Sequence, residues 1–240
     1  MIINTRPKNL SQNINALCTK EKIDLTNLHL SKITPVSSKE VIESWRTKLE
    51  SLQSYSNIIF TSQASASYGL EILKTKIDLK KIQSNIFSIG LATKKIIEDK
   101  GMSSILPNQP SSEFLAELIL EEYPGRNLLF CGTNSNRTLQ KILKNNIDEI
   151  ACYDLIYSDF EVASVNQGPK IVLIYNYLTF SFIHKAIDRK TLLEKRFIVS
   201  SQRIKDKIGR NFGNEVLDMN IDVAESPSDE SMLKKAKEFI

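Results

Sequence analysis

The sequence predicts an α/β protein made of two similar domains, each with a parallel sheet covered by helices. Short apolar segments of strand length alternate with amphipathic helical segments along the chain. The same order of strands and helices occurs twice, and matching segments are separated by roughly 110–130 residues. Strands that alternate with helices form parallel sheets, because each helix carries the chain back across one face of the sheet. Chance similarity between ordinary strand–helix units is the alternative to a duplication.

The first copy covers the first half of the chain. Its strands are expected at 1–4, at the end of an apolar stretch at 33–36, at 57–60 and at 86–89. Ser37 and Glu40 have the spacing of a capping box, which predicts that a helix begins there. Further helices are expected after the turn Thr61-Ser62 and after Gly90.

The second copy begins at Arg126. Its strands are expected at 127–130, around 150–153, at 170–174 and at 196–199, and the segment 226–230 resembles 109–113 in composition. The helix expected after Ser37 interrupts the first copy, so the chain is expected to cross between domains near Val36 and to return near Tyr157. This predicts a discontinuous domain, 1–36 plus 160–240, and a continuous domain, 37–159.

Composition excludes several classes of protein. A chain of 240 residues with 41% hydrophobic and 25% charged residues is an ordinary globular protein. No apolar run approaches the ~20 residues that span a bilayer, and the N-terminus does not resemble an export signal. Cys18, Cys131 and Cys152 share no metal-type spacing and fit buried thiols in a reducing compartment. A cytoplasmic protein without membrane contact is therefore expected.

Charge and motifs narrow the partners further. The net charge of +4 is spread over scattered lysines, which disfavours nucleic acid and suits an anionic small molecule. His29 and His184 each lack a second ligand at helical spacing, so no metal is expected. The glycine-rich nucleotide motifs and the nucleophile elbow do not occur. An enzyme of this sequence needs no such cofactor and works through positioning, hydrogen bonds and a phenol or carboxyl acid.

Small polar residues follow the predicted strands. They are Thr5-Arg6, Thr61-Ser62, Gly90, Gly132-Thr133, Asn176 and Ser200-Ser201. In open α/β sheets ligands bind beyond the carboxyl ends of the strands, where helix N-termini present backbone N–H groups to anions. Ordinary helix capping is the alternative role for each of these residues.

The ordered motifs resemble the uroporphyrinogen-III synthase family over nearly the whole chain. They are Thr5-Arg6-Pro7, Ile59-Phe60-Thr61-Ser62, Ile89-Gly90-Leu91-Ala92-Thr93 with Gly101, Leu128-Leu129-Phe130-Cys131-Gly132 with Arg137 and Leu139, Cys152-Tyr153, and Ala224-Glu225-Ser226-Pro227-Ser228-Asp229-Glu230. The resemblance implies two flavodoxin-like parallel-sheet domains joined by a two-stranded connector, with the active site in the interdomain cleft. It also implies a cofactor-independent lyase of haem biosynthesis. Such an enzyme closes hydroxymethylbilane, inverts the terminal pyrrole ring and releases water to give uroporphyrinogen III.

The resemblance also implies roles for individual residues. Tyr153 is expected to protonate or hydrogen-bond the leaving hydroxyl, since a phenol with a pKa of ~10 keeps its proton at neutral pH. Tyr157 is the rival donor, and a half-buried strand aromatic is the alternative for Tyr153. Substrate carboxylates are expected to bind the residues Arg6, Thr61, Ser62, Gly90, Thr93, Gly132, Asn134, Arg137, Asn176 and Ser200.

Two turns depart from the family pattern, Ile174-Tyr175-Asn176-Tyr177 and Ser200-Ser201-Gln202-Arg203. The sequence therefore supports a binding role for the discontinuous domain less strongly than for the continuous domain. The alternative function is a non-catalytic two-domain binding or sensor module for a small anion. A monomer is expected, because no strong self-association feature stands out.

Overall fold

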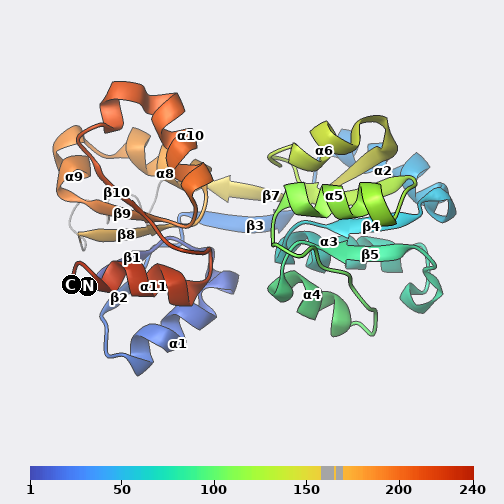
Figure 1. Cartoon of the computed structure of the whole chain (residues 1–240), viewed down its shortest axis with the longest axis horizontal. Coiled ribbons are helices and arrows are strands. Elements are labelled where there is room, and N and C mark those ends of the chain that lie inside the picture. Colours follow the sequence, from blue (N-terminus) through green and yellow to red (C-terminus); the bar gives the residue numbers. More distant parts are fainter. Residues whose placement is uncertain (158–164, 166–169) are drawn as a thin grey trace. The chain divides into compact units, whose positions relative to one another are not determined.

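The computed structural model describes residues 1–157, 165 and 170–240. The chain divides into two compact units (Figure 1). Unit 1 consists of Met1–Lys32 and Ile156–Ile240, and unit 2 consists of Ile33–Leu155. The chain passes from one unit to the other within the strands Ser31–Pro35 and Ile147–Tyr157. The limits expected from the sequence, 36 and 159, lie one and two residues beyond the ends of these strands.

Unit 1 contains a five-stranded sheet in the order β10-β9-β8-β1-β2, and every neighbouring pair is parallel. Its strands are β1 (Ile2–Asn4), β2 (Leu25–Asn27), β8 (Ile171–Ile174), β9 (Arg196–Val199) and β10 (Asn220–Val223). Its helices are α1 (Gln12–Lys20), α8 (Tyr177–Ala186), α9 (Arg189–Glu194), α10 (Gln202–Phe212) and α11 (Asp229–Lys237).

Unit 2 contains a five-stranded sheet in the order β3-β7-β6-β4-β5, in which β7, β6, β4 and β5 run parallel. Its strands are β3 (Ser31–Pro35), β4 (Asn57–Phe60), β5 (Asn85–Ser88), β6 (Asn127–Gly132) and β7 (Ile147–Tyr157). Its helices are α2 (Lys39–Glu50), α3 (Gln63–Lys74), α4 (Leu91–Glu98), α5 (Ser112–Glu122) and α6 (Thr138–Leu143). The predicted α/β class with two parallel sheets is confirmed.

Each sheet is covered by helices on both faces (Figure 1). Successive strand residues point to opposite faces, so Ile3 packs with α8 and α10 while Ile2 packs with α1 and α11. In unit 2, Ile58 faces α2, α3 and α4, whereas Ile59 faces α5 and α6. The central strands are apolar at nearly every position because both of their faces are buried.

The duplication is visible in the strand order. Reading from one edge, β2-β1-β8-β9 in unit 1 corresponds to β7-β6-β4-β5 in unit 2. The first copy contributes β1 and β2 to unit 1 and β4 and β5 to unit 2. The second copy contributes β6 and β7 to unit 2 and β8 and β9 to unit 1. From the sequence, the stretch at 33–36 was expected to be the first-copy counterpart of β7. The strand order shows that β2 is that counterpart. Its three half-buried residues gave only a weak strand signal.

Two further expectations need correction. Ser38, not Ser37, caps α2, because the Ser38 Oγ accepts the backbone N–H of Val41 at 3.4 Å and donates to the Glu40 carboxylate at 2.6 Å. The edge strand β10 was not predicted. Its residues are intermediate or exposed, so it lacks the apolar run by which buried strands are recognised.

Candidate functional site

Most of the predicted site residues lie at one edge of the sheet in unit 2. Parallel strands end at a common edge, so the turns after β4, β5 and β6 are neighbours there. We call this the unit 2 edge and define it by Thr61, Ser62, Gly90, Gly132 and Tyr153. The corresponding unit 1 edge carries Arg6, Asn176 and Ser200, which follow β1, β8 and β9.

A β-bulge brings Tyr153 to the end of β6. Cys131 pairs with Ala151, but the next residue, Gly132, pairs with Tyr153, so Cys152 is the extra residue on β7. A Cβ atom added at Gly132 would lie 2.7 Å from Cζ of the Tyr153 ring. Glycine at position 132 therefore allows the ring of Tyr153 to lie against the backbone of β6.

The hydroxyl of Tyr153 meets the N-cap of α3. Tyr153 Oη and Ser62 Oγ are 3.2 Å apart, and either atom can be the donor. Ser62 is fixed by a capping box, in which its Oγ accepts the Ser65 N–H at 3.1 Å and its own N–H donates to Ser65 Oγ at 2.9 Å. The Tyr153 ring stacks on Tyr68 of α3, with ring centroids 6.4 Å apart.

The surroundings of Tyr153 favour its protonated form. Burial raises the pKa of Tyr153 above its ordinary value of 10.0. The hydrogen bond with Ser62 lowers this pKa, while the buried thiols of Cys152 and Cys131 raise it further. Tyr153 therefore holds its proton at neutral pH, as a proton donor must.

Tyr157 lies in unit 1 and meets the N-cap of the matching helix, α8. Its hydroxyl donates to Asn176 Oδ1 at 3.0 Å and lies 3.3 Å from Thr179 Oγ1. Asn176 Oδ1 also accepts the Thr179 N–H at 2.8 Å, which fixes the amide orientation. Burial raises the pKa of Tyr157 to about 12, although the hydrogen bonds with Thr179 and Asn176 oppose the shift.

Gly90 and Thr93 lie at the start of α4. Gly90 is its N-cap with extended backbone, and a Cβ added there would meet no atom within 4 Å. Gly90 thus leaves open space above the N-terminus of α4. The Thr93 side chain is only 5% exposed, so it offers little surface to a ligand, in contrast to what the sequence suggested.

Asn134 and Arg137 lie in the connection between β6 and α6, and both are exposed. Arg137 has a left-handed backbone (φ 58°) and its guanidinium pairs with the Glu149 carboxylate at 3.0 Å. Burial opposes ionisation of Glu149, but hydrogen bonds from Gln140 and Arg137, with the Arg137 charge, outweigh it and lower its pKa. Arg137 is therefore an arginine with an acidic partner, yet 58% of its side chain is exposed.

At the unit 1 edge, Arg6 is held by a cluster that the sequence did not predict. Its Nε lies 3.1 Å from the Asp229 carboxylate and its Cζ lies 3.8 Å from the centroid of the Tyr175 ring. Tyr175 donates to the same Asp229 oxygen at 2.9 Å. The charge of Arg6 is thus already matched by a buried carboxylate, and Ser200 is buried beside it, with its Oγ donating to the Tyr175 carbonyl at 3.3 Å.

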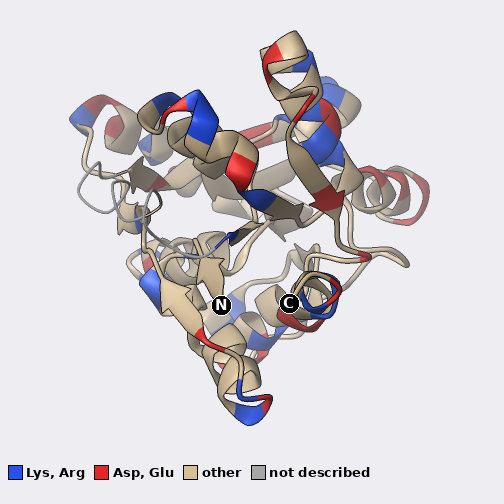
Figure 2. Cartoon of the chain, turned by 90° about the vertical axis from the view of Figure 1, so that its left-hand side faces the viewer, with Lys and Arg blue, Asp and Glu red and all other residues tan. Residues whose placement is uncertain are grey.

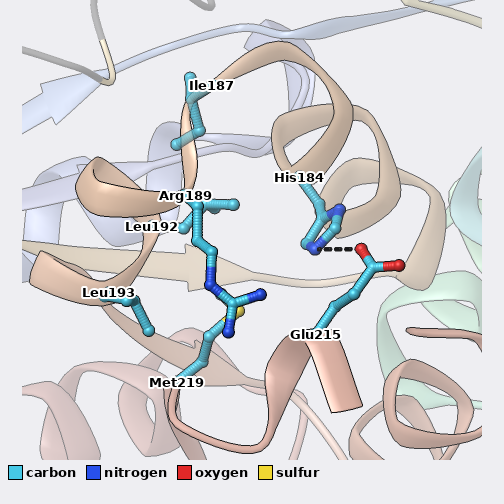
Figure 3. Close-up of a pocket in the computed structure, with 7 residues that line it drawn as sticks. All are labelled: His184, Ile187, Arg189, Leu192, Leu193, Glu215 and Met219. Atoms are coloured by element: carbon cyan, nitrogen blue, oxygen red, sulfur yellow. Dashed lines mark ion pairs between the residues drawn. The ribbon is translucent and has the colours of Figure 1, made fainter. Parts of the chain in front are cut away.

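A separate cavity of about 120 Å³ lies in unit 1 (Figure 3). It is lined by His184, Ile187, Arg189, Leu192, Leu193, Glu215 and Met219. These residues come from the end of α8, from α9 and from the segment before β10. Helices that cover a parallel sheet run opposite to its strands, so this cavity is at the amino end of the strands, away from Asn176 and Ser200.

The part of the chain that the structure describes contains no group of three or more His, Cys, Asp or Glu side chains arranged to hold a metal ion. None of its helices combines the length and apolar composition that a membrane crossing requires. Lys and Arg alternate with Asp and Glu on the helices in view in Figure 2, and Lys234, for example, pairs with Glu225 at 2.8 Å.

Comparisons with known proteins agree on one family. The family model described as uroporphyrinogen-III synthase HemD matches residues 13–233. No curated protein sequence matches the chain. Among solved structures, the uroporphyrinogen-III synthetase from Helicobacter pylori is similar with a TM-score of 0.66 at 16% identity, covering 100% of this chain and 99% of that one. A mutant uroporphyrinogen III synthase from Thermus thermophilus gives a TM-score of 0.65 at 15% identity, covering 99% and 97%.

Proposed function

The chain belongs to the uroporphyrinogen-III synthase family, and we propose that Tyr153 at the unit 2 edge is the proton donor of its reaction. The observation that carries this proposal is the half-buried phenol held between the Gly132 backbone and the N-cap of α3, where burial raises its pKa. Among the comparisons, nothing favours the alternative of a non-catalytic binding module.

The enzyme is a lyase that needs no cofactor. It closes the linear tetrapyrrole hydroxymethylbilane with inversion of the terminal pyrrole ring and releases water, which gives uroporphyrinogen III for haem biosynthesis. The hydroxyl of the substrate is a poor leaving group until it is protonated. Once water has left, the electrophilic azafulvene is attacked through the substituted carbon of the last ring, and the resulting spiro intermediate fragments and recloses.

Tyr153 supplies the proton for the first of these steps. Its Oη lies at the carboxyl end of β6, where the bulge in β7 holds it. General acid catalysis contributes typically ~10²–10⁴-fold, and holding the two ends of a flexible chain together contributes the larger share. The turns around Tyr153 provide that second contribution.

The substrate carboxylates bind at the start of α3 and α4. The first backbone N–H groups of a helix have no partner within the helix and carry its positive dipole end. Ser62 and Gly90 are the N-caps, and the open space above Gly90 leaves room for a ligand. Thr61, Gly132, Asn134 and Arg137 border the same edge, and Arg137 is the first cation that follows β6 in the sequence. Arg6, Asn176 and Ser200 of unit 1 contribute less, because the Arg6 charge, the Asn176 Oδ1 and the Ser200 hydroxyl already have partners.

The test is to supply purified protein with hydroxymethylbilane and to separate the products. Formation of the type III isomer is the expected result. Spontaneous closure without inversion gives the type I isomer, so a wild-type protein that yields only type I contradicts the function.

We further propose that the enzyme acts as a cytoplasmic monomer without a nucleic acid partner. The three cysteines are buried and unpaired, which fits a reducing compartment. Light scattering coupled to size-exclusion chromatography measures the mass directly, and a dimer mass contradicts the monomer.

A further inference from the structure

Two tyrosines of one strand meet the N-caps of two matching helices. Tyr153 contacts Ser62, the N-cap of α3, and Tyr157 contacts Asn176, the N-cap of α8. The helices α3 and α8 follow the corresponding strands β4 and β8 of the two sheets. The two pairs therefore share one arrangement but differ in the chemistry of the capping side chain.

The hydrogen-bonding capacity of Ser62 is not exhausted by its cap. A serine hydroxyl has one proton to donate and two lone pairs to accept with. One lone pair of the Ser62 Oγ accepts the Ser65 N–H. The other lone pair and the proton both remain for Tyr153 Oη, 3.2 Å away, and either direction of that hydrogen bond fits the geometry.

We propose that Ser62 is a positioning residue that reverses its hydrogen bond with Tyr153 during the reaction. At rest, Tyr153 donates to Ser62 Oγ; when Tyr153 gives its proton to the leaving hydroxyl, Ser62 donates to the phenolate oxygen. This inference rests on the proposed function and adds a residue that acts through Tyr153.

The step balances without another reactant. The proton moves from Tyr153 Oη to the substrate hydroxyl, the carbon–oxygen bond breaks, and water leaves. Tyr153 remains as a phenolate that accepts a charge-assisted hydrogen bond from Ser62. The phenolate recovers its proton when ring closure releases the hydrogen of the carbon that forms the new bond.

The groups around Tyr153 give a phenolate little support apart from the hydrogen bond from Ser62. The titratable groups that face Tyr153 are the Cys131 thiol on β6, the Cys152 thiol on β7 and the Tyr68 phenol on α3. Burial raises the pKa of both thiols, and it penalises a phenolate at Tyr153. Besides Ser62, the N-terminal end of the α3 dipole favours negative charge at this position.

The pair in unit 1 lacks this freedom. The Oδ1 of Asn176 is held toward Tyr157 by the Thr179 N–H and accepts without donating. A phenolate at Tyr157 would face that carbonyl oxygen at 3.0 Å. The Thr179 hydroxyl, 3.3 Å from Tyr157 Oη, donates instead to Asn176 Oδ1 at 3.1 Å. The N-cap side chain therefore supports the loss of a proton at Tyr153 and opposes it at Tyr157.

The experiment compares Ser62→Ala and Ser62→Thr, each with intact Tyr153 and in the Tyr153→Phe background. Ser62→Ala is expected to lower kcat about 10- to 100-fold, the cost of losing a hydrogen bond to a charged group. Ser62→Thr keeps a hydroxyl and the cap, so its kcat is expected within about threefold of wild type. In the Tyr153→Phe background, Ser62→Ala is expected to change kcat less than about twofold, because two residues that act as a unit are not additive.

The matched control is Ser111→Ala. Ser111 caps α5 in the same unit through the Phe114 N–H, so this variant loses an N-cap without touching Tyr153. Its kcat is expected to stay at the wild-type value. A second readout is the pKa of Tyr153, followed by ¹³C NMR of protein labelled at tyrosine Cζ, with the signal assigned by its absence in Tyr153→Phe. This pKa is expected to rise in Ser62→Ala alone.

Either of two results overturns the role of Ser62. One is a Ser62→Ala variant with wild-type kcat and an unmoved Tyr153 pKa; the other is an equal loss of kcat in the Tyr153→Phe background. In both cases a wild-type protein that still forms the type III isomer leaves the proposed function standing. A wild-type protein that forms only type I overturns both.

Discussion

The two edges carry the same arrangement with different capping residues. In unit 2 a serine hydroxyl meets the half-buried phenol of Tyr153, and in unit 1 an asparagine amide oxygen meets the half-buried phenol of Tyr157. Both contacts stabilise a helix N-terminus, but only the serine can reverse its role from acceptor to donor. The two units thus share a strand order and a tyrosine at a helix N-cap, but the capping side chain itself can change from acceptor to donor only in unit 2.

The largest expected effect separates the two tyrosines. Tyr153→Phe removes the proton donor and is expected to lower kcat by ~10²–10⁴-fold. Its hydrogen bond with Ser62 is lost as well, at a cost of about 1 kcal/mol of stability. Tyr157→Phe removes one hydrogen bond from the cap of α8 and is expected to cost about 1 kcal/mol of stability with less than a tenfold loss of kcat. Steady-state rates and urea unfolding of both variants check this. The reverse ranking in kcat would assign the donor to unit 1.

A second contrast concerns Arg6 and Arg137, the two predicted site arginines, each of which has an acidic partner. Asp229 is 6% exposed and Arg6 17%, whereas Arg137 is 58% exposed. Asp229→Asn leaves Arg6 without its partner charge and is expected to cost about 3 kcal/mol of unfolding free energy. Glu149→Gln, at the exposed pair, is expected to cost less than about 1 kcal/mol. Equal losses in urea unfolding would contradict the distinction between a structural Arg6 and a ligand-accessible Arg137.

The sequence predicts the strands and turns of the candidate site but not the contacts between its side chains. The strands at 57–60 and 196–199 were predicted to the residue, because buried parallel strands are continuous apolar runs. The turn residues Ser62 and Gly132 were identified for the same reason, as small residues directly after such runs. The contact between Tyr153 and Ser62 was not predicted, since it depends on a bulge whose position is set by pairing between β6 and β7.

The ion pair between Arg6 and Asp229 could not be predicted either, because it too depends on long-range packing. In the sequence, Asp229 stands out only as one residue of the motif 224–230, far from Arg6 in the chain. Its side chain reaches Arg6 because α11, which begins at Asp229, packs with α1 against the sheet that contains β1. Local patterns define elements, whereas long-range pairing decides which polar groups are already satisfied.

A third prediction tests the bulge itself. Gly132→Ala places a methyl group 2.7 Å from the Tyr153 ring, so the ring or the strand must move. Overpacking of this kind is expected to cost about 2 kcal/mol of stability, and displacing the donor is expected to lower kcat by up to ~10²-fold. The control is Gly209→Ala within α10, where no atom lies within 4 Å and the change is expected to stabilise the helix by up to about 1 kcal/mol. A Gly132→Ala variant with wild-type rate and stability would remove the argument for a close approach.

The smallest expected effect concerns acid and a histidine of unit 1. Both histidines of the chain, His29 and His184, belong to unit 1. Burial lowers the pKa of His184 below its ordinary value of 6.5, although the Glu215 carboxylate 3.5 Å away opposes the shift. The unfolded chain therefore binds this proton more readily than the folded one.

Neutral His184 makes its full contribution to the free energy of unfolding above about pH 6.5, the pKa of histidine in the unfolded chain. This contribution declines as the pH falls toward the lower pKa of His184 in the folded protein. Urea midpoints at pH 7.5 and 5.5 measure the decline in wild type, in His184→Gln and in Glu215→Gln. His184→Gln is expected to show a smaller difference between the two midpoints, because the group that binds the proton is gone. Glu215→Gln is expected to show a larger one, because the carboxylate that supports the protonated ring is lost. A smaller difference between the two urea midpoints in Glu215→Gln would contradict this prediction. The ion pair with Glu215, rather than burial, would then determine the pKa of His184, and acid would stabilise unit 1 through this residue.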